Sequence, residues 1–273
     1  MSGARNALKL TLGRVAEAAL PALAREIDED RNPTHAPGLK RAILYARLRR
    51  AQAAGDTVAI EEALAAYWTG DAGDRFHGRF VDERFGLFRD HHAVAIDVLG
   101  GLIDDGLVVS RLVEIGCGDG AVAAYCAQRL PGVPQVIGLD INAAVIARNA
   151  AGQPSGSRLS FVRAEARDWL TANPQPGTVV LTNGGVLEYL SEVNFDSLLQ
   201  ALALAPPAAL VLIEPVAPEH DLENQDRSFV FGREKSFSHN HRRRLEGAGF
   251  EVAWAEEKHV WDTRWMLMAG IRR

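Results

Sequence analysis

The sequence predicts an α/β fold built on a doubly wound sheet, preceded by a helical N-terminal region. Three observations predict it. An apolar run at residues 112–115 is followed at once by Gly116, Gly118 and Gly120. Beyond this turn, short apolar runs alternate with helical segments as far as residue 271, which is typical of a parallel sheet with crossover helices. Before it, apolar residues recur at helical spacing.

The glycine turn marks a nucleotide-binding end of this fold. Glycine is needed where a side chain would keep the backbone from closing on a ligand, or where φ is positive. Residues 121–130 follow as a helix whose N-terminus faces that ligand. A glycine-rich turn alone is a weak signal. Asp140 strengthens it, because it ends the next apolar run, 140 − 120 = 20 residues beyond Gly120, where a carboxylate is placed to accept hydrogen bonds from ribose hydroxyls.

Glu114 lies two residues before the first glycine, at the carboxyl end of the strand. A buried carboxylate is costly unless it is paired, so we expect it to meet a donor or a positive charge. Together, Glu114, the three glycines and Asp140 resemble class I S-adenosylmethionine-dependent methyltransferases of the small-molecule type, over residues 105–273. Two other classes stay open, an NAD(P)-dependent oxidoreductase and a non-catalytic protein that retains the cofactor fold.

The resemblance implies a set of cofactor-binding residues. The glycine turn contacts the methionine part of the cofactor, and the acid after the second strand binds the ribose. The pair Glu165-Ala166 stands where the family commonly has an Asp-Ala pair against the adenine, with Asp168 as the fallback. The full set is Glu114, Gly116, Cys117, Gly118, Gly120, Asp140, Ile141, Glu165, Ala166 and Asn183.

The resemblance also implies a seven-stranded sheet of order 3-2-1-4-5-7-6, with strand seven antiparallel. Residues 105–273 form this domain, and residues 1–104 form a helical cap that covers the substrate. Within the cap we expect a first helix kinked at Pro21, a second at 39–54, and a third capped by Asp56. The first helix packs on the same chain or on a second subunit, which leaves a homodimer open.

Acceptor-binding residues are predicted in two places. Residues 67–80 mix aromatic, acidic and basic side chains, which suits a lid or pocket wall, and Trp68 and His77 are its candidates. Residues 183–190 resemble the segment after the fourth strand of small-molecule methyltransferases, with Glu188 and Tyr189 as candidates. The segment lacks the Asn-Pro-Pro-Tyr of DNA-adenine and glutamine amide methylases. No second acid at the strand end builds a magnesium site, so no metal is expected.

The expected reaction is in-line transfer of a methyl group to an oxygen or nitrogen atom of a small molecule. A hydroxyl acceptor needs a base, whereas an amine needs only to be neutral and a carboxylate needs none. The candidate bases follow the carboxyl ends of strands or lie in adjoining loops: His241, His220 and Tyr189, then His239 and Glu188. The adjacent His91 and His92 point about 100° apart on a predicted helix at 81–103, and neither is expected to be catalytic.

The composition of the chain indicates which partners and which cellular compartment to expect. The chain has 273 residues, a net charge of −5 and 47% hydrophobic residues, which is ordinary for a soluble globular enzyme and argues against nucleic-acid binding. Cys117 and Cys126 have no metal-ligand spacing, so a reducing cytoplasm is the simplest setting. No apolar stretch is long enough for a membrane span, and no membrane partner is expected.

Overall fold

The computed structural model of the chain describes residues 2–30, 38–70, 73–74, 76, 81–154, 156–232 and 234–273. The chain forms two compact units. The first comprises Met1–Phe76 with Val230–Ser236, and the second comprises His77–Phe229 with Phe237–Arg273. Each unit is described by itself below.

The first unit is helical, with α1 (Ser2–Ala19), α2 (Pro21–Asp30), α3 (Gly38–Ala54) and α4 (Thr57–Thr69). Where one helix kinked at Pro21 was predicted, two helices are present: α1 ends at Ala19 and Pro21 begins α2, where its missing backbone N–H is tolerated. The side chain of Asp56 accepts a hydrogen bond from Ala59 N at 3.0 Å, so the predicted N-cap of α4 is present. A small core holds the helices together: Ala16, Ile27, Ile43 and Leu44.

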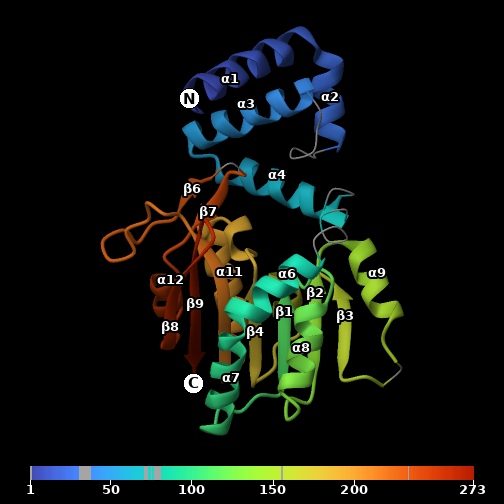
Figure 1. Cartoon of the computed structure of the whole chain (residues 1–273), viewed down its shortest axis with the longest axis vertical. Helices are drawn as coiled ribbons and strands as arrows, with labels where there is room; N and C mark the ends of the chain where they lie inside the picture. Colours follow the sequence, from blue (N-terminus) through green and yellow to red (C-terminus); the bar gives the residue numbers. More distant parts are fainter. Residues whose placement is uncertain are drawn as a thin grey trace. The chain divides into compact units, whose positions relative to one another are not determined.

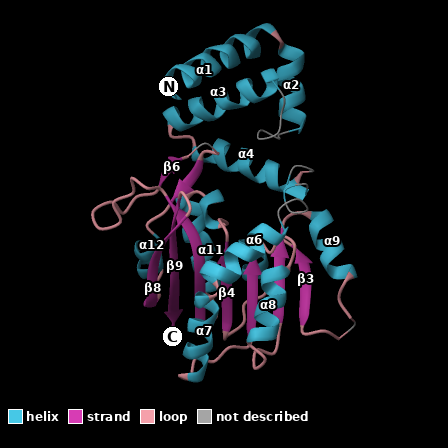
Figure 2. Ribbon diagram, in the orientation of Figure 1, coloured by secondary structure: helices cyan, strands magenta, loops and turns pink. Residues whose placement is uncertain are grey.

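The second unit is built on a seven-stranded sheet of order β3-β2-β1-β4-β5-β9-β8, in which β9 runs antiparallel to β5 and β8 (Figure 2). This confirms the predicted order. The strands are β1 (Arg111–Ile115), β2 (Val136–Asp140), β3 (Leu159–Arg163), β4 (Thr178–Asn183), β5 (Ala208–Val216), β8 (Glu251–Val260) and β9 (Thr263–Arg272). Strands β1, β2 and β5 are buried along their whole length, because helices cover both faces of the sheet.

The helices form two layers over this sheet (Figure 1). One face packs against α6 (Val81–Leu87), the π-helical turn η1 (Phe88–His92), α7 (Val94–Asp104) and α8 (Ala121–Arg129). The other face packs against α10 (Ala166–Ala172), α11 (Glu192–Leu202) and α12 (His241–Gly247). The remaining elements are α9 (Ala143–Ala151), the 3₁₀ turn η2 (Leu187–Tyr189) and the hairpin β6 (Phe229–Phe231) and β7 (Ser236–Ser238).

The boundary between the units differs from the predicted boundary at residue 104. Phe88, Ile96 and Leu99 are fully buried and belong to the same core cluster as the strand residue Leu112. Burial of these side chains against the sheet places residues 81–104 with the second unit. The helix predicted at 81–103 is present, interrupted by the π-helical turn.

Candidate active site

The glycine turn after β1 forms a cradle with no room for side chains. Gly116, Gly118 and Gly120 all have positive φ, at 67°, 50° and 78°. A Cβ on Gly116 would lie 2.7 Å from Cγ2 of Val186, and a Cβ on Gly120 would lie 2.6 Å from Cζ of Phe161. A side chain at Gly116 or Gly120 would therefore clash with the packed core of the protein.

Asp140 ends β2 beside this cradle and already organises it. Its Oδ2 accepts a hydrogen bond from Gly118 N at 3.0 Å, and its Oδ1 accepts one from Asn142 N at 2.8 Å. Burial raises the pKa of the Asp140 carboxyl above its ordinary value, against the effect of these backbone hydrogen bonds. Each oxygen keeps a further lone pair, which is available to a hydroxyl donor.

Glu114 lies under the cradle at the carboxyl end of β1 and is 3% exposed. Burial raises the pKa of its carboxyl well above the ordinary value, and the carboxylates of Asp119 and Asp140 raise it further, against a hydrogen bond from the backbone of Ala123. Its Oε2 makes no hydrogen bond to any residue that the structure describes. The predicted donor is thus present, and one oxygen still lacks a partner.

Sequence reasoning missed a cation at this cradle. Arg84 of α6 donates from Nη2 to Oδ2 of Asp119 at 2.7 Å, and Asp119 lies within the glycine turn. The electrostatic influence of Asp140 also reaches this guanidinium. No local pattern points to Arg84, because the pair joins segments 35 residues apart.

The other predicted cofactor residues lie around the cradle. Cys117 is buried in the turn, and its backbone N–H donates to Leu139 O at 2.9 Å. Ile141 follows Asp140 directly, and Arg163 Nε donates to its carbonyl at 3.3 Å. Glu165 is the N-cap of α10, where its side chain accepts from Asp168 N at 2.9 Å, and Ala166 is the first residue of that helix. Their contacts with a cofactor stay predictions.

Asn183 ends β4, the strand next to β1, and it faces a buried histidine. Its side chain lies beside His92 and opposes the lowering of the His92 pKa, and the ring of His92 lies 4.7 Å from that of Trp265 on β9. Burial lowers the pKa of His92 to about 4, so the imidazole is neutral at ordinary pH. Nε2 of His92 and Oδ1 of Asn183 have no hydrogen-bond partner by distance and angle among the described residues.

Two of the predicted bases use both ring nitrogens within the protein. His220 meets Ser238 Oγ at 2.8 Å through Nδ1 and the Gln225 carbonyl at 3.2 Å through Nε2. Since a carbonyl accepts, Nε2 carries the hydrogen. His239 likewise meets Ser228 Oγ at 2.7 Å and donates to the Leu187 carbonyl at 3.0 Å. For either histidine to act as a base, it would have to give up one of these hydrogen bonds to the acceptor. Their catalytic roles stay predictions.

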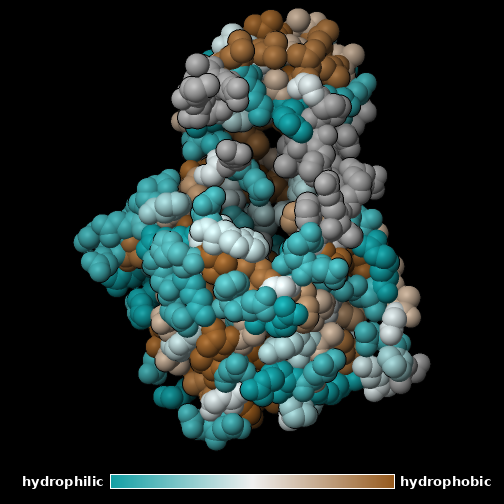
Figure 3. Space-filling view, in the orientation of Figure 1, coloured by the Kyte–Doolittle hydropathy of each residue, from teal (hydrophilic) through white to brown (hydrophobic). Residues whose placement is uncertain are grey.

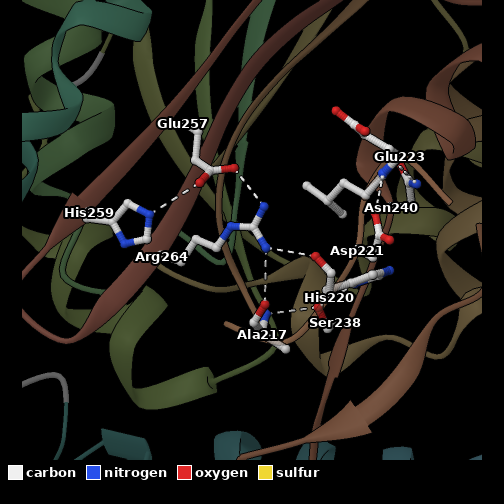
Figure 4. Close-up of polar contacts among 10 residues, drawn as sticks. Ala217, His220, Asp221, Glu223, Ser238, Asn240, Glu257, His259 and Arg264 are labelled. Atoms are coloured by element: carbon white, nitrogen blue, oxygen red, sulfur yellow. Dashed lines mark hydrogen bonds and ion pairs between the residues drawn. The ribbon is translucent and has the colours of Figure 1, made fainter. Parts of the chain in front are cut away.

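His241 begins α12 and lines a cavity of about 690 Å³ against β8 and β9. It is fully buried, which lowers the pKa of its ring well below the ordinary value. Neither ring nitrogen has a hydrogen-bond partner within the described ranges. Arg264 borders the same cavity and donates to the carbonyl of His220 at 2.8 Å and to Glu257 at 2.8 Å (Figure 4). Strand β5 separates β9 from β4, so this cavity is apart from the cradle.

The predicted acceptor residues fall into two places. Glu188 and Tyr189 lie in the turn η2 directly after β4, beside Asn183. Trp68 lies near the end of α4 in the first unit, where its ring meets those of Tyr67 at 4.8 Å and Phe76 at 5.4 Å. His77 lies outside the described residues.

Comparisons with known proteins agree with the class of protein that the fold and the glycine cradle indicate. Residues 112–205 match the model of a family described as a methyltransferase domain. Trans-aconitate 2-methyltransferase of Streptomyces avermitilis is 32% identical over 111 residues, an alignment that covers 32% of this chain and 41% of the relative. The match therefore spans about two fifths of that relative's length.

Solved structures share the fold. Magnesium protoporphyrin IX methyltransferase from Synechocystis PCC 6803 with bound S-adenosylmethionine has a TM-score of 0.55 and 17% identity, over 78% of this chain and 97% of that chain. The same protein with bound S-adenosylhomocysteine has a TM-score of 0.53 and 18% identity, over 76% and 97%. At these identities the likeness concerns the fold.

The sheet unit has the fold of the class I, Rossmann-like S-adenosylmethionine-dependent methyltransferases, and its segment 112–205 matches the methyltransferase domain family named above. The predicted fold class and the predicted resemblance to this class are confirmed. The cradle also fits the cofactor of this class: one oxygen of Glu114 lacks a partner and can accept from the ammonium group, and a bound cation would oppose the burial that raises the pKa of this carboxyl.

The described part of the chain contains no group of three or more His, Cys, Asp or Glu side chains that could hold a metal ion. None of its helices is both long and apolar enough to cross a membrane.

Proposed function

We propose that this protein methylates an oxygen or nitrogen atom of a small molecule. When bound, S-adenosylmethionine supplies an electrophilic methyl group for in-line displacement. The observation that carries the proposal is the cradle, in which three positive-φ glycines, a partnerless oxygen of Glu114 and Asp140 meet at the carboxyl edge of the sheet. Ligands of open α/β sheets bind at this edge.

Different residues of the chain would contact different parts of the cofactor. Gly116, Cys117, Gly118 and Gly120 present main chain to the methionine part. Asp140 accepts hydrogen bonds from the ribose, with Ile141 beside it, and Glu165 and Ala166 border the adenine. Arg84 is added to the predicted set, because a guanidinium next to the cradle suits the methionine carboxylate and is oriented by Asp119.

The acceptor approaches from β4 and β5, since the cofactor occupies the edge of β1 and β2. Glu188 and Tyr189 lie on that side. Trp68 and His77 are proposed as further substrate contacts, on the strength of the unusual composition of residues 67–80 alone.

His92 is our proposal for the proton acceptor, ahead of the predicted His220, His241 and Tyr189. It is neutral, its Nε2 has no hydrogen-bond partner in the described structure, and it lies beside Asn183 at the border of the two ligand sides. A hydroxyl becomes strongly acidic as its oxygen forms a new bond to carbon, so a weakly basic imidazole suffices. π-Helical turns such as the one that ends at His92 are frequent at functional sites.

The remaining predictions about partners and setting are kept as proposals. α1 exposes apolar side chains on Leu8, Leu12 and Val15, at 69%, 47% and 59%, and the surface view shows apolar residues over this helix (Figure 3). Such a face is a place where a second copy of the chain would bury apolar area. A homodimer and a cytoplasmic setting stay predictions.

Two measurements test the proposed function. Calorimetric titration with S-adenosylhomocysteine and with NADH should show micromolar binding of the first and none of the second. A methyl-transfer screen by mass spectrometry should then include trans-aconitate and magnesium protoporphyrin IX, named after the relatives, within a metabolite library. Absence of S-adenosylhomocysteine binding would overturn the proposal, and binding without turnover on any library member would favour a non-catalytic protein.

The acceptor found in that screen also tests His92. His92→Gln should lower kcat about a hundredfold or more for a hydroxyl acceptor, with S-adenosylhomocysteine affinity unchanged. His91→Gln is the matched control, because His91 is the exposed neighbour on the same turn. Equal kcat in the two variants would remove His92 from the chemistry.

A further inference from the structure

Two buried side chains form hydrogen bonds with the turn of residues 186–189, one on each side of it. Oε2 of Glu214, on β5, accepts hydrogen bonds from Val186 N at 2.9 Å and from Leu187 N at 3.0 Å. From the other side, Nε2 of His239 donates to the Leu187 carbonyl at 3.0 Å. Glu214 and His239 are both completely buried. The conformation of the turn therefore depends on these two side chains.

The same turn borders both ligand sides. The Val186 side chain lies against Gly116, so closely that a Cβ on Gly116 would be 2.7 Å from Cγ2 of Val186. Val186 is thus one wall of the cofactor cradle. Glu188 and Tyr189, at the far end of the turn, are the residues proposed above to contact the acceptor. A shift of this turn would alter the cradle and the acceptor side together.

Glu214 is an unusual group to hold such a turn. Burial raises the pKa of its carboxyl to about 7, and the neighbouring Thr182 together with hydrogen bonds from the backbone of residues 186–188 keeps it from rising further. Its charge therefore changes near neutral pH. Hydrogen bonds to an ionised acceptor are roughly twice as strong as those to a neutral one, so the ionised carboxylate holds the turn more firmly.

We propose that Glu214 is a positioning residue for the cofactor: its ionised carboxylate fixes the turn 186–189 against Gly116, so that cofactor affinity rises as Glu214 loses its proton. This rests on the proposed function through the cofactor cradle only, and it needs no assumption about the acceptor. Binding that requires the fixed turn must favour ionised Glu214, and linkage then makes affinity depend on pH.

The other groups around Glu214 would not produce this dependence of cofactor affinity on pH. Thr182 on β4 and Met266 on β9 do not titrate. His239 stays neutral above pH 5, because burial lowers its pKa to about 4. Glu188 lies in the turn itself and is titratable, so it enters the experiment as a separate variant.

The test compares S-adenosylhomocysteine affinity at pH 6, 7 and 8 by calorimetry in the intact chain and in Glu214→Gln, which keeps an oxygen to accept from the turn. The intact chain should bind up to about tenfold more weakly at pH 6 than at pH 8, beyond any change in Glu214→Gln. Glu188→Gln and Glu219→Gln, the latter an exposed carboxylate beyond the end of β5, should keep the full response. A response that persists in Glu214→Gln would overturn the proposal, as would its loss in Glu188→Gln.

A measurement on the unmodified protein covers the case in which Glu214→Gln does not fold. With ¹³C-labelled glutamate, the Glu114 signal is assigned from its loss in Glu114→Gln. Another carboxyl, that of Glu214, should titrate near pH 7, and saturation with S-adenosylhomocysteine should move that titration to lower pH. An unmoved titration would overturn the proposal. If the unmodified protein binds no S-adenosylhomocysteine at any pH, the proposed function fails as well, whereas binding with an unmoved titration removes only the role of Glu214.

Discussion

Asp140→Ala is the sharpest test of the cofactor site. In the protein both carboxylate oxygens of Asp140 already hold backbone N–H groups, those of Gly118 at 3.0 Å and Asn142 at 2.8 Å. These bonds fix the orientation of the carboxylate, and we expect its remaining lone pairs to accept hydrogen bonds from ribose hydroxyls. Hydrogen bonds to a charged acceptor contribute about 1.5–3 kcal/mol. Their loss should weaken S-adenosylhomocysteine binding about 10- to 150-fold.

The assay is calorimetric titration with S-adenosylhomocysteine and with its 2′-deoxy analogue. The parent protein should prefer the ribose compound, and Asp140→Ala should bind the two alike. Asp262→Ala is the control, since that carboxylate is exposed in the turn between β8 and β9 and belongs to no part of the proposed cofactor site. If Asp140→Ala binds S-adenosylhomocysteine as tightly as the parent, or still prefers the ribose form, the assignment of the ribose to Asp140 is wrong.

Three further predictions follow from burial and packing. Gly116→Ala should destabilise the fold by about 1–3 kcal/mol and weaken cofactor binding, because φ is 67° and the new Cβ would meet Val186; thermal unfolding and calorimetry measure both. For Glu214, the folded pKa of about 7 lies above the ordinary 4.5, so the folded state binds more protons between these values. Its contribution to the free energy of unfolding should therefore fall by about 3 kcal/mol as pH rises from 4.5 to 7 and then stay level, and urea titrations of Glu214→Gln should lack this fall. A shortened chain that begins at residue 105 should aggregate, because it loses Phe88 and Leu99, which are fully buried against the sheet; a soluble, folded product by light scattering and circular dichroism would contradict this.

Local pattern was enough to predict the sheet and its cradle. The apolar runs and the glycines that punctuate them are properties of neighbouring residues, so the positions of β1, β2 and the turn at Gly116 follow from the sequence alone. The strand order came from the resemblance carried by Glu114 and Asp140. The unit boundary was predicted at 104 instead of after Phe76, because helical periodicity does not say which core a helix joins.

Tertiary structure decided the pairings that give this site its chemistry. Arg84 meets Asp119 across 35 residues, and Glu214 meets the turn at Leu187 across 27. His92 was expected to be non-catalytic, and its role as a base stays a proposal; the structure brings it, at the end of the π-helical turn, beside Asn183 at the end of β4. Such contacts join side chains from elements that are distant in the chain, and periodicity and spacing carry no information about them. The altered pKa values of Glu214 and His92 have the same origin, since burial in the assembled core is their largest cause.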